Sequence, residues 1–214
     1  MTYAVAQGPW TAKQLVTDYL TADLPRRIVA FREAWGVDDE RLPIPEYYHA
    51  YEPPALDHWP MVITVQLSMS RLERIDYGDG PNPIYRCAYA LRTYLWTRAE
   101  TPEGVTETRD RLTTVIRASL LDHPCLQRTI QDIHGQGHQL LLDERSLREE
   151  YSDISVVKGD RCIAGAYLSY DVLLDEMIGR SSIGEVAEID LSFDAGGASG
   201  TTLTPDVVTR IISD

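Results

Sequence analysis

The chain has 214 residues, 43% of them hydrophobic, which is enough for one domain with a real core. Its formal net charge of −13 argues against a nucleic-acid-binding surface, which needs a basic footprint. No apolar run approaches the roughly 20 residues that span a bilayer, the first ten residues lack a signal-peptide pattern, and three widely spaced cysteines favour a reducing compartment over a disulfide framework.

Two helices are predicted in residues 1–37, as a helical extension at the N-terminus. Thr11 is the expected cap of the first, with Gln14 at the reciprocal capping-box position. The second is expected to begin near Leu24 and to stop at Gly36. Its apolar residues form one stripe at helical spacing, namely Leu24, Ile28, Phe31 and Trp35.

Residues 38–60 form a segment of a different kind, rich in proline and tyrosine. Proline forbids a continuous helix or a central strand here, so an ordered loop is predicted. The prolines and aromatic residues interleave: Pro43, Pro45, Tyr47, Tyr48, Tyr51, Pro53, Pro54, Trp59 and Pro60. Two interpretations stay open, a loop that covers the chain's own core and a loop that contacts a partner.

Residues 61–98 carry the strand patterns. Met61–Ser68 is a predicted strand, and a weaker one near Arg71–Tyr77 is followed by a turn at Tyr77–Pro81. The long strand Ile84–Arg98 alternates: Tyr85, Cys87, Tyr89, Leu91 and Leu95 share one face, and Arg86, Arg92 and Arg98 share the other. Both faces are partly apolar, which predicts a central strand that is fully covered on one side and partly covered on the other.

Glu103–Leu121 is the best-marked helix. It is preceded by Thr101 as a cap and Pro102 at the first position. Its expected buried stripe consists of Val105, Leu112, Val115, Ile116, Ser119 and Leu120.

The remaining residues predict further strands and a tail. Gln139–Leu142 is a candidate short strand, Asp143–Tyr151 a charged surface segment, Arg161–Glu176 a second long strand and Ile183–Phe193 a final strand. Residues 195–200 are a glycine-rich linker. The apolar patch at Leu203–Ile212 suits docking on a neighbour or folding back on its own domain.

The predicted fold class is therefore α+β, with a mixed, mostly antiparallel sheet packed against helices, an N-terminal helical extension and a flexible C-terminal tail. Residues 1–194 are expected to form a single domain, in which 61–194 hold the core sheet and helix. Residues 195–214 are the linker and tail.

Histidines and cysteines are the first candidates for a metal or catalytic site. His134 and His138 have a metal-ligand spacing, but Gly135 and Gly137 make a helix improbable and favour a glycine-rich loop. His123 and Cys125 flank Pro124 without an evident orienting acid, which favours helix-end residues over a nucleophile pair. Cys87 and Cys162 are expected to be free, buried and structural. No metal, cofactor or catalytic residue is predicted.

Carboxylates gather near the strand ends, namely Asp175, Glu176, Glu185, Glu188 and Asp190. Such groups can do acid–base chemistry or bind a divalent cation. Their spacing matches no cation-binding loop, so a solvated or pore-facing surface is favoured. For Arg86, Arg92 and Arg98, acidic partners are expected within the fold or across a subunit boundary.

The order of elements over residues 60–178 resembles that of the tail terminator, or tail-completion, proteins of long-tailed bacteriophages. The likeness lies in the strand Tyr85–Arg98, the helix Thr106–Leu121 and the strand that begins Asp160–Arg161. That last strand has the form D-R-x-x-A-x-A-x-L-x-Y, with Ala164, Ala166, Leu168 and Tyr170 at its fixed positions.

The resemblance implies a structural virion protein without catalytic residues. Such proteins form a hexameric ring that caps the head-proximal end of the tail tube, stops tube growth and meets the head connector or stopper protein. Genomic DNA passes through the lumen, and the protein would occupy the virion neck after assembly in the host cytoplasm. The alternatives are another head–tail adaptor or stopper and, from a different class, a metal-dependent enzyme that uses the strand-end carboxylates.

Overall fold

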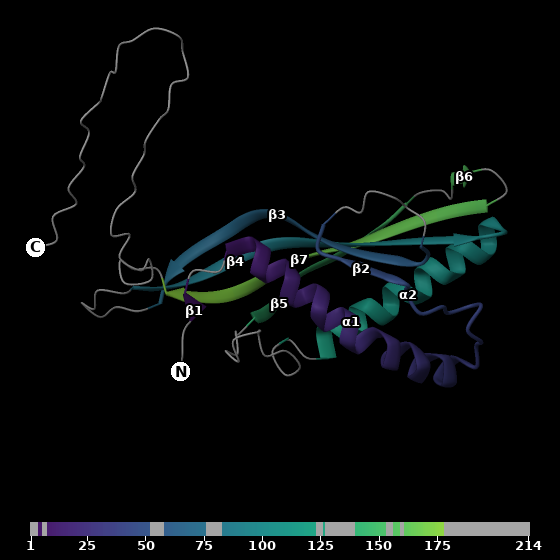
Figure 1. Cartoon of the computed structure of the whole chain (residues 1–214), viewed down its shortest axis with the longest axis horizontal. Coiled ribbons are helices and arrows are strands. Elements are labelled where there is room, and N and C mark those ends of the chain that lie inside the picture. The colour runs from purple at the N-terminus through teal and green to yellow at the C-terminus, as the bar shows by residue number, and fades with distance from the viewer. Residues whose placement is uncertain are drawn as a thin grey trace, which may run out of the picture. The chain divides into compact units, whose positions relative to one another are not determined.

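The computed structural model describes residues 4–5, 8–51, 58–75, 83–122, 126, 140–152, 156–158 and 161–177. These residues form two helices and a mixed sheet (Figure 1). In chain order the elements are β1 (Ala4–Val5), α1 (Gly8–Trp35), β2 (Tyr47–His49), β3 (Met61–Arg74), β4 (Ile84–Ala99), α2 (Pro102–Asp122), β5 (Leu140–Tyr151), β6 (Val156–Lys158) and β7 (Arg161–Met177). The α+β class predicted from the sequence is confirmed.

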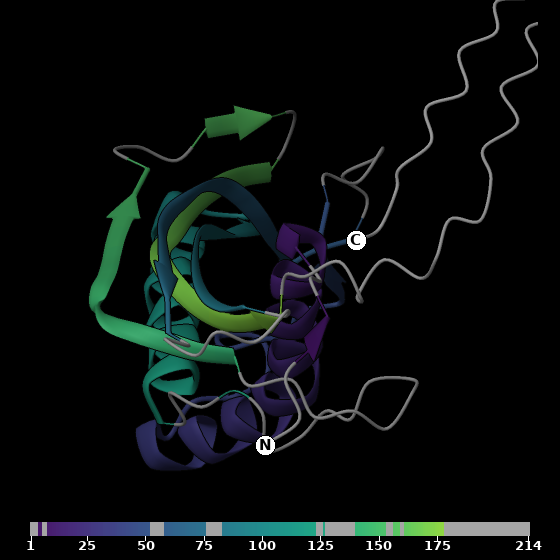
Figure 2. The same cartoon turned by 90° about the vertical axis from the view of Figure 1, so that its left-hand side faces the viewer.

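The sheet is built around the two longest strands. Its order is β1-β7-β4-β3-β2, and β5 and β6 also pair with β7. The β3–β4, β4–β7, β5–β7 and β6–β7 pairs are antiparallel, whereas β1–β7 and β2–β3 are parallel. Figure 2 looks along the strands and shows that the sheet is strongly curved, as the right-handed twist of long strands requires.

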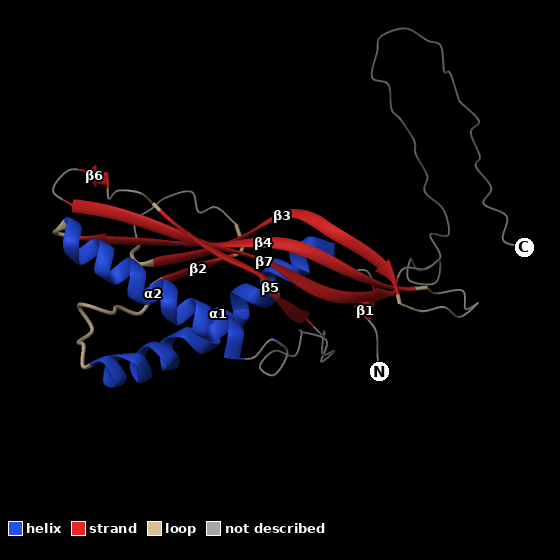
Figure 3. Ribbon diagram, turned by 180° about the vertical axis from the view of Figure 1, so that it is seen from behind, coloured by secondary structure: helices blue, strands red, loops and turns tan. Residues whose placement is uncertain are grey.

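Both helices pack on one side of the sheet (Figures 1 and 3). Because successive strand residues point to opposite faces, even-numbered β7 residues and odd-numbered β4 residues turn toward the helices and are buried. The expected split of the β4 side chains between two faces is confirmed. The core contains the predicted α2 stripe, and its large buried side chains include Leu20, Leu24, Ile28, Leu91, Leu95, Leu112, Ile116, Leu120 and Leu168.

The N-terminal region forms one helix, so the prediction of two helices is wrong. α1 starts at Gly8, which has φ of +71°, and runs through Pro25 to Trp35. Thr11 is therefore inside the helix and is not its cap. Tertiary packing overrides the proline because the buried side of α1 is apolar on both sides of Pro25, with Val16 and Leu20 before it and Ile28 after it. The helix is part of the core and is not an appended extension.

Hydrogen bonds also join the helices to each other. The Tyr19 hydroxyl donates to the Ser119 carbonyl oxygen at 2.8 Å, and the Ser119 hydroxyl donates to Asp23 Oδ2 at 2.6 Å. Asp23 is 1% exposed and also accepts from Arg26 and Arg27. Its burial alone would raise the pKa of the carboxyl, but the hydrogen bonds from Arg27, Ser119 and Arg26 outweigh that effect and lower it.

Two strands are longer than the sequence predicts. β3 is one strand from Met61 to Arg74, with register shifts between Gln66 and Ser68 and between Met69 and Arg71, where two separate strands were expected. β5 continues from Leu140 to Tyr151 and includes the segment taken for charged surface. Charged side chains are compatible with this strand because it lies at an edge of the sheet, where they point into water and discourage further pairing.

The proline- and tyrosine-rich segment does cover the chain's own core in part. Leu42, Pro45, Ala50 and Pro60 are buried, and Tyr47–His49 forms β2 at the sheet edge instead of remaining a loop. Tyr51, in contrast, is 51% exposed. The segment's contact with a partner stays a prediction.

The predicted turn at Tyr77–Pro81, the predicted strand at Ile183–Phe193, the linker and the C-terminal tail lie outside the described residues. None of the helices in the described part of the chain is long and apolar enough to cross a membrane.

Candidate interaction surface

The side of the sheet that faces away from the helices carries a set of arginine and aromatic side chains. On β4 it presents Arg86, Arg92, Tyr94, Trp96 and Arg98, interrupted only by small alanines. Opposite these residues β7 places Asp175, Ser169, Tyr167, Gly165 and Ile163 in that order. Register alone therefore brings together side chains that are some 65 to 90 positions apart in the chain.

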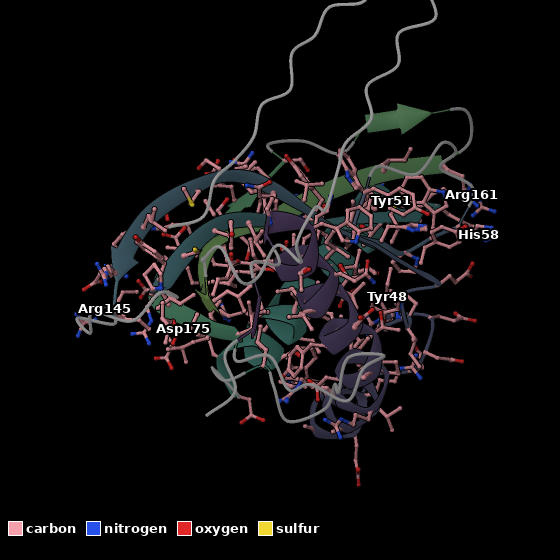
Figure 4. All side chains as sticks on the ribbon, turned by 60° about the vertical axis from the view of Figure 1, so that its left-hand side comes forward. Tyr48, Tyr51, His58, Arg145, Arg161 and Asp175 are labelled. Atoms are coloured by element: carbon pink, nitrogen blue, oxygen red, sulfur yellow. The ribbon has the colours of Figure 1, made fainter. Side chains whose placement is uncertain are left out.

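An ion pair lies at one end of this face. Arg86 donates to both carboxylate oxygens of Asp175, at 2.7 and 2.8 Å, a bidentate geometry that raises the pKa of the guanidinium. The acidic partner expected for Arg86 is confirmed. Figure 4 shows Asp175 and Arg145 at this end of the sheet and Arg161 at the other.

Arg92 has aromatic rings where an acid was expected. Its guanidinium carbon lies 4.1 Å from the centre of the Tyr167 ring and 5.8 Å from that of Tyr94. Its Nε donates to the Ser169 hydroxyl at 3.1 Å, and its Nη1 donates to the Tyr94 hydroxyl at 3.3 Å. Stacking on an aromatic face holds the cation in place without neutralising it.

Trp96 and Arg98 follow Arg92 and Tyr94 on the same face of β4. A Cβ on Gly165 would lie 2.9 Å from two carbons of the Trp96 ring, so only glycine at this position lets the indole lie flat on β7. Trp96 remains 37% exposed. Arg98 lies 5.9 Å from the centre of the Trp59 ring, which comes from the proline- and tyrosine-rich segment. We call Arg92, Tyr94, Trp96, Arg98 and Tyr167 the Arg–aromatic row.

Asp175 and Glu176, the candidate acid–base pair, point to opposite faces of the sheet because successive residues of a strand alternate between its faces. Asp175 points to the open face and binds Arg86, while Glu176 is 2% exposed on the helix side. There Glu176 accepts from the Tyr89 hydroxyl at 2.8 Å and from the Gly8 N–H at 3.3 Å. Burial and this carboxylate together raise the pKa of Tyr89. The two acids therefore cannot act on one substrate atom, and Glu176 fixes the start of α1 to β7.

The other candidates divide in two groups. Cys87 and Cys162 are free and buried, as predicted, and burial followed by the charge of Glu176 raises the pKa of Cys87, which favours the unreactive thiol. His123, Cys125, His134, His138, Glu185, Glu188 and Asp190 lie outside the described residues. Within the described residues no group of three or more histidine, cysteine or acidic side chains is placed to hold a metal ion.

A second exposed feature, which sequence patterns did not single out, lies on β3. β2 pairs only with Met61–Ile63, so the rest of β3 is an edge of the sheet in the described structure. Leu67, Met69 and Leu72 are each about half exposed there. Two register shifts against β4 interrupt the regular ladder in this half of β3, and such irregularities favour contact through side chains over addition of a strand.

Neither a protein-family model nor a curated protein sequence matches the chain. Function must therefore be argued from the residues and their arrangement.

Proposed function

We propose that this protein is a structural component of a bacteriophage tail, a terminator whose ring caps the head-proximal end of the tail tube. The ring, of six subunits, stops tube polymerisation and joins the tail to the head connector or stopper protein. DNA passes through its lumen without specific binding. The site of action is the virion neck, after assembly in the host cytoplasm, and no catalysis is involved.

The observation that carries the proposal is the order and pairing of the elements. The family likeness implies a two-strand hairpin, a long strand with arginine and tyrosine, a helix, a charged loop and a last long strand, in a mixed sheet with helices packed against it. β4, α2 and β7 follow this order, and β4 and β7 are paired along their full length. One strand, β3, stands in place of the hairpin, and the strand β5 stands in place of the charged loop. Both helices lie on one side of the sheet, so within the described residues the other face and the outer part of each edge strand carry no further layer.

The two sheet edges differ in a way that supports a ring. β5 carries six charged residues, whereas the outer half of β3 presents Leu67, Met69 and Leu72. Two unlike edges suit a head-to-tail contact, and head-to-tail contacts close into rings when the rotation between subunits allows it.

Two alternatives remain. A neighbouring neck protein, either an adaptor or a stopper, would share the fold and the edges but would bind on the portal side. The metal-dependent enzyme loses one of its premises, because Asp175 and Glu176 point to opposite faces of the sheet.

The test is electron microscopy of cognate tail tubes mixed with the purified protein. Rings are expected at one end of each tube, and tube lengthening should stop when tube subunits are added afterwards. The double variant Met69→Glu/Leu72→Glu should stay folded, because both side chains are already half exposed, and should no longer decorate tube ends. Val29→Glu, at an equally exposed apolar position on α1, is the matched control. Protein that never binds tube ends, or that binds only portal complexes, would exclude the terminator role.

A further inference from the structure

The two arginines of the Arg–aromatic row are held by aromatic rings and a hydroxyl group instead of carboxylates within the described residues. Other described arginines do form ion pairs: Arg26 and Arg27 with Asp23, Arg41 and Arg111 with Glu107, Arg86 with Asp175, Arg109 with Asp110, Arg117 with Glu149, and Arg161 with Glu100. Arg92 and Arg98 have no carboxylate within ion-pair distance among the described residues. The chain has 33 acidic and 20 basic residues, so a shortage of acids does not explain why these two arginines lack a carboxylate partner among the described residues.

The nearest acids on β5 are already engaged. Glu150 accepts a hydrogen bond from the Tyr167 hydroxyl, and Glu149 is held by Arg117 with oxygens at 3.0 Å. β5 therefore forms no ion pair with the row, although the negative charge of Glu150 acts on Arg92 from a distance.

The row is also shaped for an extended ligand. Arg92, Tyr94, Trp96 and Arg98 are alternate residues on one face of β4, so the backbone positions of the two arginines lie roughly 20 Å apart along the strand. Between them lie two aromatic rings, and the Trp96 ring is kept flat against Gly165. Tryptophan, tyrosine and arginine are the side chains that contribute most to protein–protein contacts.

We propose that the Arg–aromatic row is a docking surface for an extended acidic segment of a second protein. Carboxylates of that segment pair with Arg92 and Arg98, and its apolar or aliphatic groups cover Trp96 and the tyrosines. The proposal goes beyond the tail role and does not depend on it.

A nucleic acid fits this surface less well, although it too is anionic and stacks on aromatic rings. Duplex binding of useful strength draws on roughly 6–10 phosphate contacts, whereas the row offers two free guanidinium groups. Glu150 lies beside Tyr167 at the margin of the row, and the net charge of −13 repels a long polyanion. A short acidic segment needs only two ion pairs and meets far less of that repulsion.

The experiment is a fluorescence-polarisation titration of the full-length protein with a labelled peptide that alternates glutamate and serine over about twelve residues, long enough to reach both arginines. We expect saturable, salt-sensitive binding. The double variant Arg92→Gln/Arg98→Gln should weaken it by about tenfold or more, since charge-assisted pairs are lost. Trp96→Ala should weaken it by a smaller factor.

The matched control is Arg41→Gln/Arg145→Gln, which removes the same charge from two exposed arginines outside the row and should change binding by less than about twofold. A peptide with glutamine in place of glutamate should not bind. Circular dichroism of each variant checks that it is folded.

Other outcomes would overturn the proposal. Equal weakening by both double variants would show a general charge effect, and preferred binding of a labelled oligothymidine would identify a nucleic-acid surface. Self-association of the protein alone that Arg92→Gln/Arg98→Gln abolishes would make the occupant a second copy of this chain. Because tube-end binding is measured separately, loss of the tail role leaves this result intact.

Discussion

Asp23 shows how a single residue joins the two helices. It is buried where α1 meets α2, and it gathers Arg26, Arg27 and the Ser119 hydroxyl around one carboxylate. Nothing in the local sequence marks it as a core residue, because an acid among arginines at i+3 and i+4 looks like a solvated helix face. The signal that was missed is Ser119, 96 residues away, which sits on the predicted buried stripe of α2.

The free energy of unfolding should therefore depend on pH through the carboxyl group of Asp23. Its pKa in the folded protein lies below the ordinary value of 3.8, so the ionised carboxylate stabilises the fold above that pH. That contribution is lost as the pH falls through the lower, folded-state pKa. Asp23→Asn should cost about 3 kcal/mol at neutral pH, because it leaves buried donors poorly paired, and should lose less further stability on acidification than the parent.

Urea unfolding at a series of pH values between about 7 and 2 measures this difference. Asp39→Asn, at an exposed position, is the control and should follow the parent at every pH. A pH profile of Asp23→Asn that runs parallel to that of the parent would show that Asp23 is not the titrating group.

At the scale of elements, periodicity predicted β4, α2 and β7 to within about two residues and gave the correct face for each β4 side chain. These elements are strongly patterned because each has one fully buried side. β5 and the second half of β3 were misjudged because their side chains meet water, so hydrophobic alternation is weak there. The Arg–aromatic row was only half predictable: alternation put Arg92 and Arg98 on one face, but the pairing of Arg92 with Tyr167 depends on strand register.

The continuity of α1 through Pro25 gives a sharp test at this scale. Proline at that position has no N–H to donate to the Thr21 carbonyl, and an interior proline costs a helix about 3 kcal/mol. Pro25→Ala should therefore stabilise the protein by about 1–3 kcal/mol in urea unfolding. Pro9→Ala is the matched control, since a proline in the first helical turn lacks only an N–H that has no partner within the helix, and should change stability by less than about 0.5 kcal/mol. Destabilisation by Pro25→Ala would argue for two helices with a functional break between them.

At the scale of the whole molecule, charge is the dominant property. Acids outnumber bases 18 to 14 in residues 1–138 and 15 to 6 in residues 139–214. In the described structure several arginines are paired with acids of the same chain, and the acidic excess sets the field that another molecule meets. A ring through which a genome slides benefits from such a field, because an acidic wall does not replace the counterions of DNA and so does not hold it.

We therefore expect the free protein to have no measurable affinity for duplex DNA at about 0.15 M salt. Arg92 and Arg98 bear most directly on this expectation, because they lie beside aromatic rings on one strand face and have no carboxylate at ion-pair distance among the described residues. Two cations are nevertheless far fewer than the phosphate contacts that even non-specific binding uses, and each contact adds only about one unit to the salt dependence of affinity. Polarisation or gel-shift titration with a labelled duplex decides the question, with Arg92→Gln/Arg98→Gln as the comparison. Tight, salt-sensitive binding that this double variant abolishes would contradict the proposed non-adhesive channel and would identify the Arg–aromatic row as a nucleic-acid site.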